Sequence, residues 1–441
     1  MTTPNNQSSL QHWIDWLLQL HPKEVELGLD RIRLVSTSMQ LLRPAPFVIS
    51  VAGTNGKGSS VAMLVSILKA AGYQVGAYTS PHIQSFNERI QIDGLPVSDA
   101  DITKAFDQIE TARGGIKLTY FEFATLAALS VFKQASLDVV VLEVGLGGRL
   151  DAVNVVDADV ALITAIGIDH VEWLGDDRSV IATEKAGITR SGRLAVCSDS
   201  APPESLLVYA KQNTVPLMQL NKDFRLDCFE DSWSMIGLSE AFIKVSHIDS
   251  HKNFPLPSLK GSFQLQNAAG VVALLSLQDR LKISKEAICT GLQQAKHPGR
   301  LDSFQVQDQS WLVDVAHNPQ SAQALAEYLE QISSDRSEGG YTAIFSVLND
   351  KDALPMIQMI APFVKNWVIV DLSVPRASSI VELTELLINA GVAKNRILPQ
   401  ETMVKAVTSV QKEPSTPILV WGSFFTVSQV YGCLDQRLDL L

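Results

Sequence analysis

The chain has 441 residues, of which 46% are hydrophobic and 19% charged, and its formal net charge is -11 at pH 7. This length exceeds what one hydrophobic core usually serves, so two domains are expected, and the composition is typical of a globular protein rather than a disordered or fibrous one. The negative charge argues against broad binding to nucleic acid or anionic membranes, although it leaves room for a locally positive pocket. Four scattered cysteines, without CxxC pairs or clustered histidines, indicate reduced thiols rather than a disulfide framework or a zinc site: Cys197, Cys228, Cys289 and Cys433.

The N-terminal segment is typical of a cytoplasmic protein. Residues 1–10 are polar and lack the basic-then-apolar pattern of a signal peptide. From Leu10 to Leu20 the large apolar residues fall on one face, which predicts an amphipathic helix. No apolar stretch approaches bilayer length; the longest, around 268–277, is expected in an amphipathic helix.

A glycine-rich turn follows the apolar run from Pro46 to Ala52 and opens into an amphipathic helix expected near Ser60 to Ala71. The turn reads Gly53-Thr54-Asn55-Gly56-Lys57-Gly58-Ser59. Its glycines let backbone N–H groups converge on an anion, while the helix N-terminus, the lysine and the serine hydroxyl add positive potential and an oxygen for Mg²⁺. The pattern predicts a nucleoside triphosphate site, with a plain strand–turn–helix connection as the alternative. Its spacing is unusual, because Gly58 separates Lys57 from Ser59.

The next elements alternate between strands and helices. A short strand is expected over 74–79, and Ser98 with Asp101 predicts a capping box for a helix that runs to about residue 113. Another helix follows the segment 118–122 and runs to about residue 134. Two nearly all-apolar runs, 138–144 and 159–166, then indicate strands covered on both faces of a parallel sheet.

Both of these strands lead into polar residues, at the sheet edge where ligands bind in open α/β folds. The first ends in Glu143 with Gly145–Arg149, and the second leads to Asp169 and His170.

The rest of the chain predicts an extension and a second domain. Short irregular strands indicate a β-rich extension from about Lys222 to Lys260, and helices are expected near 265–277 and 284–295. The Pro298-Gly299 pair marks a domain boundary. Beyond it, strands are expected near 311–315, 343–347, 367–370 and 418–421, with helices between them. The expected fold is a P-loop-type parallel sheet domain with helices on both faces, residues 1–298, and a smaller Rossmann-like α/β domain, residues 299–441.

A second motif, Asp314-Val315-Ala316-His317-Asn318-Pro319, follows the first strand of the second domain. Pro319 is expected to start the next helix. Asp314 and His317 are candidates for holding a ribose and an adenine. In the alternative interpretation, the aspartate caps the helix and the histidine is a packed polar group.

Three motifs together carry a family resemblance: Gly53 to Ser59, Glu143 to Asp151 and Asp314 to Pro319. From about Trp13 to Val427 the chain resembles the folate-linked branch of the Mur ligase superfamily, with the motifs in the same order. The resemblance implies that a carboxylate attacks the γ-phosphate of ATP, and that the amine of glutamate displaces phosphate from the resulting acyl phosphate. The implied cofactors are ATP and Mg²⁺, with two ions expected and a monovalent cation left open. The implied substrates are 7,8-dihydropteroate, reduced folates and L-glutamate.

The resemblance also implies roles for individual residues. Lys57, Lys185 and His170 are expected in catalysis, and the expected metal ligands are Ser59, Ser80, Glu143 and His170. Lys185, in the segment Glu184–Ile188, matches a family lysine that carries a carbamate; alternatively it is an ordinary helix-surface lysine. Without the resemblance, Arg300 could be a solvated linker charge and His170 a satisfied polar residue. The residues expected to bind ATP are Thr54, Asn55, Gly56, Lys57, Gly58, Ser59, Asn267, Arg300, Asp314 and His317.

Three matched segments are expected to bind the pterin: Leu27-Gly28-Leu29-Asp30, Thr119-Tyr120-Phe121-Glu122 and Leu150-Asp151-Ala152. Tyr120 or Phe121 could stack on a flat heterocycle, or could equally anchor the following helix in the core. Two positions depart from the family. Phe425 stands where close relatives often carry His, which removes a polar role there. Ser85 stands where some relatives carry Arg, which puts in doubt one basic contact to a folate tail.

We therefore expect a cytoplasmic, monomeric ATP-dependent amide ligase that adds L-glutamate to 7,8-dihydropteroate and extends reduced folates with γ-linked glutamates. Alternatives with the same architecture are a ligase that acts only on folylpolyglutamates and one that acts on a cell-wall nucleotide precursor. A P-loop kinase or motor ATPase would explain Lys57 but leaves Asp314–Pro319 unexplained. A nucleotide-binding regulator without catalysis is disfavoured by Glu143, His170 and Lys185 together. No nucleic acid or membrane partner is expected.

Overall fold

The computed structural model describes residues 3–5, 7–23, 25–246, 253–333, 340–413 and 415–434. The chain divides into two compact units. The larger contains Met1–Ser258 with Gln264–Lys296, and the smaller contains Leu259–Phe263 with His297–Leu441. All four cysteines are free thiols, as the sequence predicted. A search of the described residues finds no helix with the length and apolar character needed to cross a membrane.

The larger unit is built on an eight-stranded sheet in the order β4-β3-β2-β5-β1-β6-β7-β8. The six neighbouring strands β2, β5, β1, β6, β7 and β8 are parallel to one another. Beyond β2, the strands β3 and β4 extend the sheet with antiparallel pairing. Every residue of β1, β5 and β6 is buried, which confirms the prediction of strands covered on both faces. The strands are β1 Phe47–Ala52, β2 Val75–Tyr78, β3 Ile90–Ile92, β4 Leu95–Pro96, β5 Val139–Glu143, β6 Val160–Ile163, β7 Ala195–Cys197 and β8 Leu217–Gln219.

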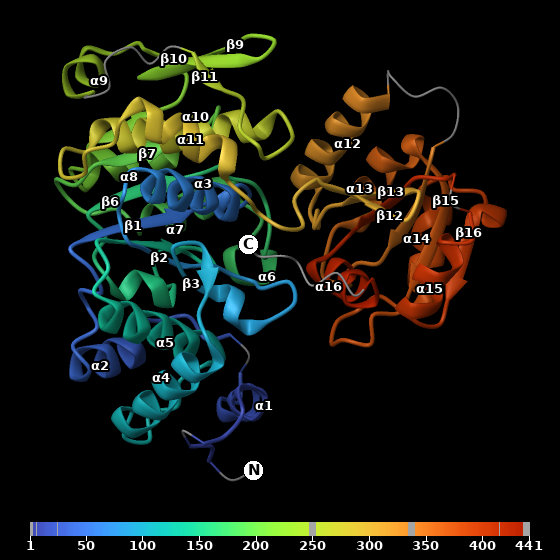
Figure 1. Cartoon of the computed structure of the whole chain (residues 1–441), viewed down its shortest axis with the longest axis horizontal. Helices are drawn as coiled ribbons and strands as arrows, with labels where there is room; N and C mark the ends of the chain where they lie inside the picture. The colour runs from blue at the N-terminus through green and yellow to red at the C-terminus, as the bar shows by residue number, and fades with distance from the viewer. Residues whose placement is uncertain are drawn as a thin grey trace. The chain divides into compact units, whose positions relative to one another are not determined.

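Helices cover both faces of this sheet, with α3, α10 and α11 on one face and α5 and α7 on the other (Figure 1). The helices are α1 Leu10–Leu20, α2 Asp30–Ser38, α3 Lys57–Ala70, α4 Asp99–Ala112, α5 Tyr120–Ala135, α6 Val171–Leu174, α7 Arg178–Ala186, α8 Glu204–Gln212, α9 Glu240–Val245, α10 Phe263–Leu277 and α11 Lys285–Gln294, with 3₁₀ turns η1 Phe86–Arg89 and η2 Ala152–Val155. The helix predicted over 10–20 is confirmed. Ser98 caps α4 as predicted, because its Oγ accepts from Asp101 N–H at 3.2 Å. Asp101 Oδ2 accepts from the Ser98 hydroxyl at 2.6 Å, which is not the reciprocal backbone bond of the predicted capping box.

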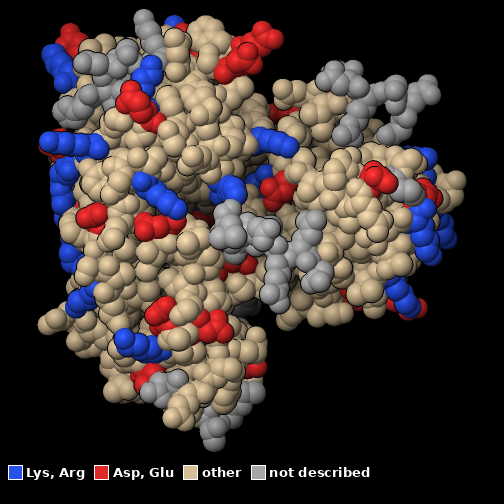
Figure 2. Space-filling model, in the orientation of Figure 1, with Lys and Arg blue, Asp and Glu red and all other residues tan. Residues whose placement is uncertain are grey.

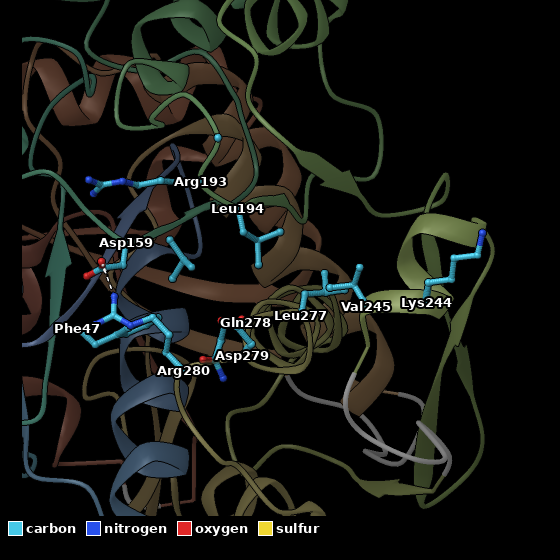
Figure 3. Close-up of a pocket in the computed structure, with 12 residues that line it drawn as sticks. Phe47, Asp159, Arg193, Leu194, Lys244, Val245, Leu277, Gln278, Asp279 and Arg280 are labelled. Carbon is cyan, nitrogen blue, oxygen red and sulfur yellow. Dashed lines mark hydrogen bonds and ion pairs between the residues drawn. The ribbon is translucent and has the colours of Figure 1, made fainter.

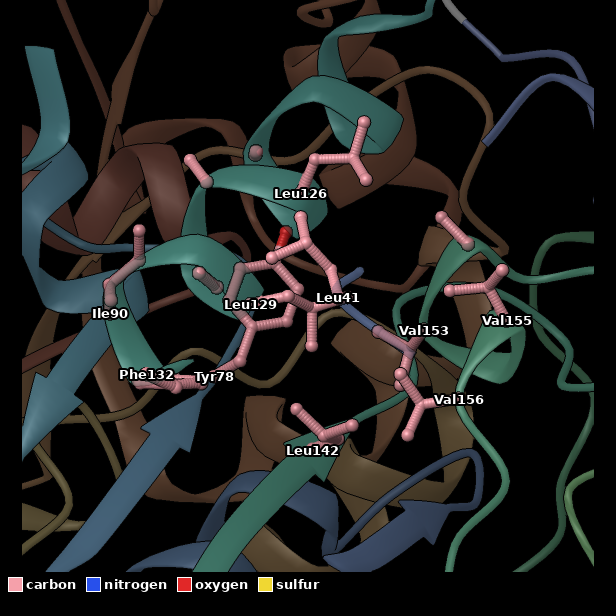
Figure 4. Close-up of a cluster of buried hydrophobic side chains, with 14 of the residues drawn as sticks. Leu41, Tyr78, Ile90, Leu126, Leu129, Phe132, Leu142, Val153, Val155 and Val156 are labelled. Carbon is pink, nitrogen blue, oxygen red and sulfur yellow. The ribbon is translucent and has the colours of Figure 1, made fainter. Parts of the chain in front are cut away.

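The core on the α5 side joins the helix, the sheet and η2. Figure 4 shows side chains from these elements meeting in one apolar cluster. Tyr78 and Leu142 come from β2 and β5, Leu126, Leu129 and Phe132 come from α5, and Val153, Val155 and Val156 come from the η2 segment.

Helix α10 is apolar on all sides rather than amphipathic. Every residue from Asn267 to Leu277 is buried, and a Cβ on Gly270 would lie 2.5 Å from Ser198 Cβ, so the helix packs directly on the sheet. The prediction of an amphipathic helix around 268–277 is therefore wrong, because a helix that is hydrophobic all round is buried all round.

The segment predicted as a β-rich extension contains both strands and a helix. Strands β9 Phe224–Cys228, β10 Ser232–Gly237 and β11 Phe254–Pro255 form an antiparallel sheet in the order β11-β10-β9. Between β10 and β11 lies the helix α9, whose N-terminus is capped by Ser239 Oγ accepting from Phe242 N–H at 3.2 Å. Residues 247–252 of the predicted extension lie outside the described residues.

The smaller unit carries a six-stranded sheet in the order β12-β13-β17-β14-β15-β16, parallel except for β12. The four predicted strands correspond to β13, β14, β15 and β17, whereas the edge strands β12 and β16 were missed. The strands are β12 Asp302–Val306, β13 Gln309–Val313, β14 Tyr341–Phe345, β15 Val364–Val370, β16 Ile397–Gln400 and β17 Ile418–Trp421. The helices are α12 Pro319–Ser333, α13 Ala353–Ile360, α14 Ile380–Asn389, α15 Met403–Val410 and α16 Phe424–Cys433, with 3₁₀ turns η3 Ala361–Phe363 and η4 Lys394–Arg396.

On the face of the larger unit seen in Figure 2, acidic and basic side chains lie among one another between wide areas of other residues. On this face the acidic side chains are thus spread among basic ones rather than gathered in one block.

Candidate active site

The phosphate loop between β1 and α3 is shaped by two glycines that have no room for a side chain. A Cβ on Gly53 would lie 1.8 Å from Thr164 Oγ1, and a Cβ on Gly56 would lie 2.4 Å from Asn267 Oδ1. Gly56 has φ 88°, in the left-handed region that glycine tolerates, and directly precedes α3. The helix therefore begins at Lys57, three residues before the predicted start. The last residues of the loop form its first turn, and the N-terminal turn of a helix favours an anion through its N–H groups and the helix dipole.

The loop is also held against the segment that follows β6. The N–H groups of Thr54 and Asn55 both donate to Ala165 O, at 2.8 and 3.3 Å. The Thr54 hydroxyl donates to Gly167 O and accepts from Gly167 N–H, each at 2.9 Å. The backbone donors of Thr54 and Asn55 are thus used inside the protein, so these two residues set the shape of the loop.

Two lysine side chains meet at one carbonyl oxygen of this loop. Lys57 Nζ and Lys185 Nζ each donate to Gly53 O at 3.0 Å. Lys185 lies in α7 and is only 4% exposed, so the alternative of an ordinary surface lysine is wrong. Burial, and then the charge of Lys57, lowers the pKa of Lys185 to about 7, although the charges of Asp169 and Asp151 oppose the shift. The neutral amine of Lys185 is therefore far more accessible near pH 7 than that of an ordinary lysine.

Oxygen-bearing side chains gather at the carboxyl ends of the neighbouring strands β2, β5 and β1. Glu143 ends β5 and is 4% exposed, and its Oε2 accepts from Ser80 N–H at 3.4 Å, just beyond β2. Ser59, which is also buried, lies in the first turn of the helix that follows β1. Because parallel strands end at the same edge of a sheet, the structure brings Ser59, Ser80 and Glu143 to the edge that carries the phosphate loop.

Gln264 links Ser59 to Asn267, and sequence reasoning missed it. The Gln264 side chain is 1% exposed, its Nε2 donates to Ser59 Oγ at 3.1 Å, and its Oε1 accepts from Asn267 Nδ2 at 3.0 Å. Gln264 and Asn267 lie three residues apart, on the same side of α10. That spacing is the only signal in the sequence that could have pointed to Gln264.

His170 lies on an exposed loop beyond β6 rather than at the end of the strand. It has φ 54° and precedes the short helix α6, and its backbone N–H donates to Asp169 Oδ1 at 2.8 Å. The charge of Asp169 acts on Lys185, so this loop lies within electrostatic range of the buried lysine.

An ion pair that sequence reasoning missed fixes the start of the loop between β6 and α6, which carries His170. Arg178 Nη2 lies 2.9 Å from Asp199 Oδ2. Arg178 Nε donates to Ile166 O, and Asp199 Oδ2 accepts from Ile166 N–H, each at 2.7 Å. Both peptide groups of Ile166 are therefore fixed, between the phosphate-loop contact at Gly167 and strand β6.

Among the described residues, no three His, Cys, Asp or Glu side chains group into a metal site. The expected ligands instead include one carboxylate and two hydroxyls at the edge of the sheet. Hard oxygen donors of this kind, too few to enclose an ion, fit Mg²⁺, which keeps water and phosphate oxygens as its other ligands.

The three segments expected to bind the pterin are neighbours in the structure. Gly28 N–H donates to Leu150 O at 3.3 Å, and Arg31, in the first turn of α2, lies 3.3 Å from Glu122 Oε1. Burial raises the pKa of Asp151 to about 6, although its backbone hydrogen bonds and the charge of Lys57 lower it. Lys57 thus acts electrostatically on the pterin segments as well.

Several of these residues also have local structural roles. Thr119 and Glu122 form a capping box: the threonine hydroxyl accepts from Glu122 N–H at 3.2 Å, and Glu122 Oε2 accepts from Thr119 N–H at 2.7 Å. The helix therefore begins at Tyr120, inside the segment that was expected to precede it. Asp151 Oδ2 accepts from Leu146 N–H at 2.8 Å. The two candidate aromatic residues are half-buried, with Phe121 packed on Gly145.

The smaller unit groups the remaining ATP candidates. Asp314 is buried, and its two oxygens accept from Leu301 N–H at 2.9 Å and Ala316 N–H at 2.7 Å. It therefore does not cap α12, contrary to the alternative interpretation; Asn318 Oδ1 does so by accepting from Ser321 N–H at 2.9 Å.

One aromatic ring, which the sequence did not single out, joins two of these candidates. The Phe424 ring lies 5.2 Å from the Arg300 guanidinium and 5.6 Å from the His317 ring. Burial raises the pKa of Asp314, and the charge of Arg300 opposes this.

The two departures from the family have different surroundings. Ser85 caps η1 in a capping box with Glu88, whose Oε1 accepts from Ser85 N–H at 2.7 Å. Phe425 is 43% exposed in the first turn of α16.

A separate hollow of about 570 Å³ lies at the opposite, amino-terminal edge of the large sheet (Figure 3). Phe47, Asp159 and Leu194 line it where β1, β6 and β7 begin. Its described lining includes none of the expected site residues, so it is distinct from the candidate active site.

The parallel sheet, its glycine-rich loop, the half-buried Lys57 and the buried Lys185 define a nucleotide-binding α/β protein of the P-loop type. Two family models match the sequence: the Mur ligase middle domain over residues 51–275, and the Mur ligase, glutamate ligase domain over residues 299–424.

Relatives that match over the full length of the chain narrow the class from Mur ligases in general to one family of them. The dihydrofolate synthase/folylpolyglutamate synthase of Escherichia coli K12 is 39% identical over 440 residues, covering 99% of this chain and 98% of the relative. That of Bacillus subtilis 168 is 32% identical over 425 residues, covering 92% and 94%.

Comparison with solved structures leads to the same family. Escherichia coli FolC in complex with DHPP and ADP has a TM-score of 0.88 and 37% identity, covering 99% of this chain and all of that one. The Yersinia pestis bifunctional folylpolyglutamate synthase/dihydrofolate synthase complexed with AMPPNP and Mn ion has a TM-score of 0.87 and 38% identity, covering 98% and 100%. The chain belongs to the dihydrofolate synthase/folylpolyglutamate synthase family of Mur ligases, as the sequence predicted.

Proposed function

We propose that this protein is an ATP-dependent amide ligase that adds L-glutamate to 7,8-dihydropteroate and extends reduced folates with γ-linked glutamates. The observation that carries the proposal is the convergence of the phosphate loop, Glu143 and Lys185 at one sheet edge, in a chain that matches bifunctional relatives over its full length. The alternatives that act only on folylpolyglutamates or on a cell-wall precursor are less well supported, because the relatives carry both activities in their names.

The cofactors are ATP and a divalent cation. The relatives of known structure were solved with ADP, or with AMPPNP and Mn ion. In this chain Ser59, Ser80, Glu143 and His170 would hold the cation; the hard oxygen donors among them fit Mg²⁺. When bound, the metal neutralises phosphate charge.

The charges of the loop explain how two anions can approach each other. A carboxylate must reach the γ-phosphate, so positive potential has to lie where the negative charges meet. The Lys57 ammonium and the first turn of α3 supply it, and Gly53 and Gly56 let the backbone come close. Lys57 and Lys185 share the Gly53 carbonyl, which keeps both side chains in the loop.

We also propose that Lys185 carries a carbamate. A neutral amine attacks CO₂, forming an N–C bond and releasing one proton, so that an anionic carbamate replaces the amine. The buried position and lowered pKa of Lys185 supply the neutral amine near pH 7. The product would relieve the repulsion between Lys57 and Lys185 and add an oxygen ligand near the metal.

The substrate-binding assignments follow the three neighbouring pterin segments. We assign the pterin to 27–30, 119–122 and 150–152. We assign further ATP contacts to Asn267 in the larger unit and to Arg300, Asp314 and His317 in the smaller. The functional domains are proposed as 1–298 and 299–441, and the protein is proposed to act in the cytoplasm.

One assay tests the function: ADP release measured with and without dihydropteroate and glutamate. The ligase releases ADP only when both substrates are present, and a glutamylated product forms in equal amount. Release that is indifferent to both substrates would indicate a kinase, a motor ATPase or a regulator and would overturn the proposal. Release with a folylpolyglutamate but not with dihydropteroate would select the monofunctional alternative.

A further inference from the structure

Arg89 is a buried arginine without a carboxylate partner among the described residues. It ends η1 and is 8% exposed. Its Nε donates to Nδ1 of His82 at 2.7 Å, and its guanidinium lies beside the contacting rings of Phe86 and Tyr120, 5.9 and 5.5 Å from their centres. Within the described part of the chain its two terminal nitrogens have no hydrogen-bond partner. They are not fully enclosed either, so they reach solvent.

Arg113 shows what a purely structural arginine looks like in the same unit. It is 9% exposed and stacks on an aromatic ring as well, 5.7 Å from Trp16. Its nitrogens are fully used, however: Nε and Nη2 bind the two carboxylate oxygens of Glu110 at 2.5 and 2.7 Å, and Nη1 donates to Ile116 O at 2.8 Å. Arginine is almost never buried unless it is paired with a carboxylate. Arg113 has such a pair, whereas Arg89 has none among the described residues.

The surroundings of Arg89 connect it to the candidate active site. Its carbonyl oxygen accepts from Thr79 N–H at 2.9 Å, one residue before Ser80. Tyr120, which covers its guanidinium, belongs to a segment assigned to the pterin. The charge of Arg89 also acts on the Tyr78 hydroxyl, together with that of Asp151. Arg89 therefore lies between the pterin segments and the strand end that carries Ser80.

We propose that Arg89 binds a carboxylate of the pterin-bearing substrate through its terminal nitrogens. Because His82 takes the Nε donor, the guanidinium offers the one edge formed by its two terminal nitrogens. That edge matches a carboxylate in a bidentate arrangement, and the two neighbouring rings restrict the plane of the guanidinium. The aromatic neighbour on the pterin segment favours this substrate over free glutamate as the source of the carboxylate. The inference rests on the proposed function, because it names a contact within the same substrate site.

The test is equilibrium binding of two probes to the full-length protein and its variants. Dihydropteroate carries the carboxylate, and 6-hydroxymethyl-7,8-dihydropterin carries the pterin without it. For Arg89→Gln we expect the Kd for dihydropteroate to rise about 10- to 100-fold, as for loss of a charged hydrogen-bonded pair, with the Kd for the pterin alcohol unchanged. Arg89→Lys keeps the charge but not the fork, so its Kd for dihydropteroate should fall between those of Arg89→Gln and the wild type.

Arg113→Gln is the matched control, because it removes an equally buried, ring-stacked arginine. It should lower the Tm and leave both Kd values unchanged. If Arg89→Gln binds dihydropteroate as tightly as the wild type, or loses both probes equally, the inference is overturned. A rise only in the KM for glutamate would also overturn it, by assigning Arg89 to the other substrate. If the wild type itself fails to couple ADP release to glutamate and dihydropteroate, it is the proposed function that fails.

Discussion

The two edges of the large sheet differ in how their charged side chains are arranged: opposite charges are paired at one edge, and like charges are held together at the other. At the amino-terminal edge, Asp159 lies between Arg43 and Arg280, at 3.0 and 2.7 Å, and also accepts from Val48 N–H at 2.8 Å. At the carboxyl-terminal edge, Lys57 and Lys185 meet at one carbonyl oxygen, and the charge of the first helps to lower the pKa of the second. Charges that neutralise each other hold strands in place, whereas like charges held together serve a ligand of opposite sign.

The largest expected effect is at Lys57. For Lys57→Ala we expect substrate-dependent ADP release to fall about 10²- to 10³-fold, because a positive charge beside the γ-phosphate is lost. The Tm should change little, since the substitution also removes the repulsion on Lys185. Steady-state kinetics and a thermal unfolding curve measure the two quantities.

Asp159→Asn is the control for this substitution at the other edge. Its arginine partners are about half exposed, so we expect a loss of about 1 kcal/mol in the free energy of unfolding. Turnover should match that of the wild type. If Asp159→Asn reduced turnover as strongly as Lys57→Ala, the two edges would not differ in function.

The carbamate proposal gives the next largest effect. Lys185→Ala should reduce turnover about 100-fold, because an anionic ligand beside the metal is lost. Short carboxylic acids such as formate or acetate should restore part of the activity by occupying the vacated space. Lys57→Ala, which removes a cation instead, should not respond to them. Unchanged turnover in Lys185→Ala, or no rescue, would contradict the carbamate.

The sequence predicted the elements whose residues interact locally or alternate regularly. The apolar runs 138–144 and 159–166 are buried parallel strands, and in the glycine-rich turn that follows β1, Gly53 and Gly56 have no room for a Cβ. The threonine-to-glutamate spacing of Thr119 and Glu122 was a capping-box signal that could have placed the start of α5 correctly.

The missed features depend on partners that are distant in the chain. The edge strand β12 alternates between half-buried and exposed residues, and β16 contains Pro399, so neither resembles a buried strand. Gln264 contacts Ser59 from 205 positions away in the chain. Arg178, which begins α7, contacts Asp199, which follows β7. Apart from the three-residue spacing of Gln264 and Asn267, these residues have no signal in the sequence, because their roles arise from tertiary contacts.

The lowered pKa of Lys185 gives a smaller, pH-dependent effect. The unfolded lysine keeps its proton up to its ordinary pKa of 10.5, whereas the folded one loses it near 7. Between these values the unfolded state binds more protons, so the free energy of unfolding rises with pH by at most about 1.4 kcal/mol per unit. In CO₂-free buffer, urea unfolding should show that the free energy of unfolding of the wild type rises relative to that of Lys185→Met from pH 7 to 9. Below pH 7 the difference should be constant, and a flat difference from pH 7 to 9 would disprove the shift.

The smallest effect compares two buried glutamines at opposite ends of α10. Gln264 holds Ser59 and Asn267 at the carboxyl-terminal edge. Gln278, next to the hollow at the amino-terminal edge, donates to Leu275 O and Leu281 O at 3.0 and 2.8 Å. Gln264→Leu leaves two site residues without their partner, so we expect the KM for Mg-ATP to rise about five- to tenfold.

Gln278→Leu should instead cost about 1 kcal/mol of unfolding free energy and leave every KM unchanged. Steady-state kinetics with urea unfolding on both variants separates loss of positioning from loss of stability. If both substitutions raised the KM for Mg-ATP alike, Gln264 would act only by holding α10 in place. A rise confined to Gln264→Leu means that the helix serves stability at one end and orients the Ser59 hydroxyl at the other.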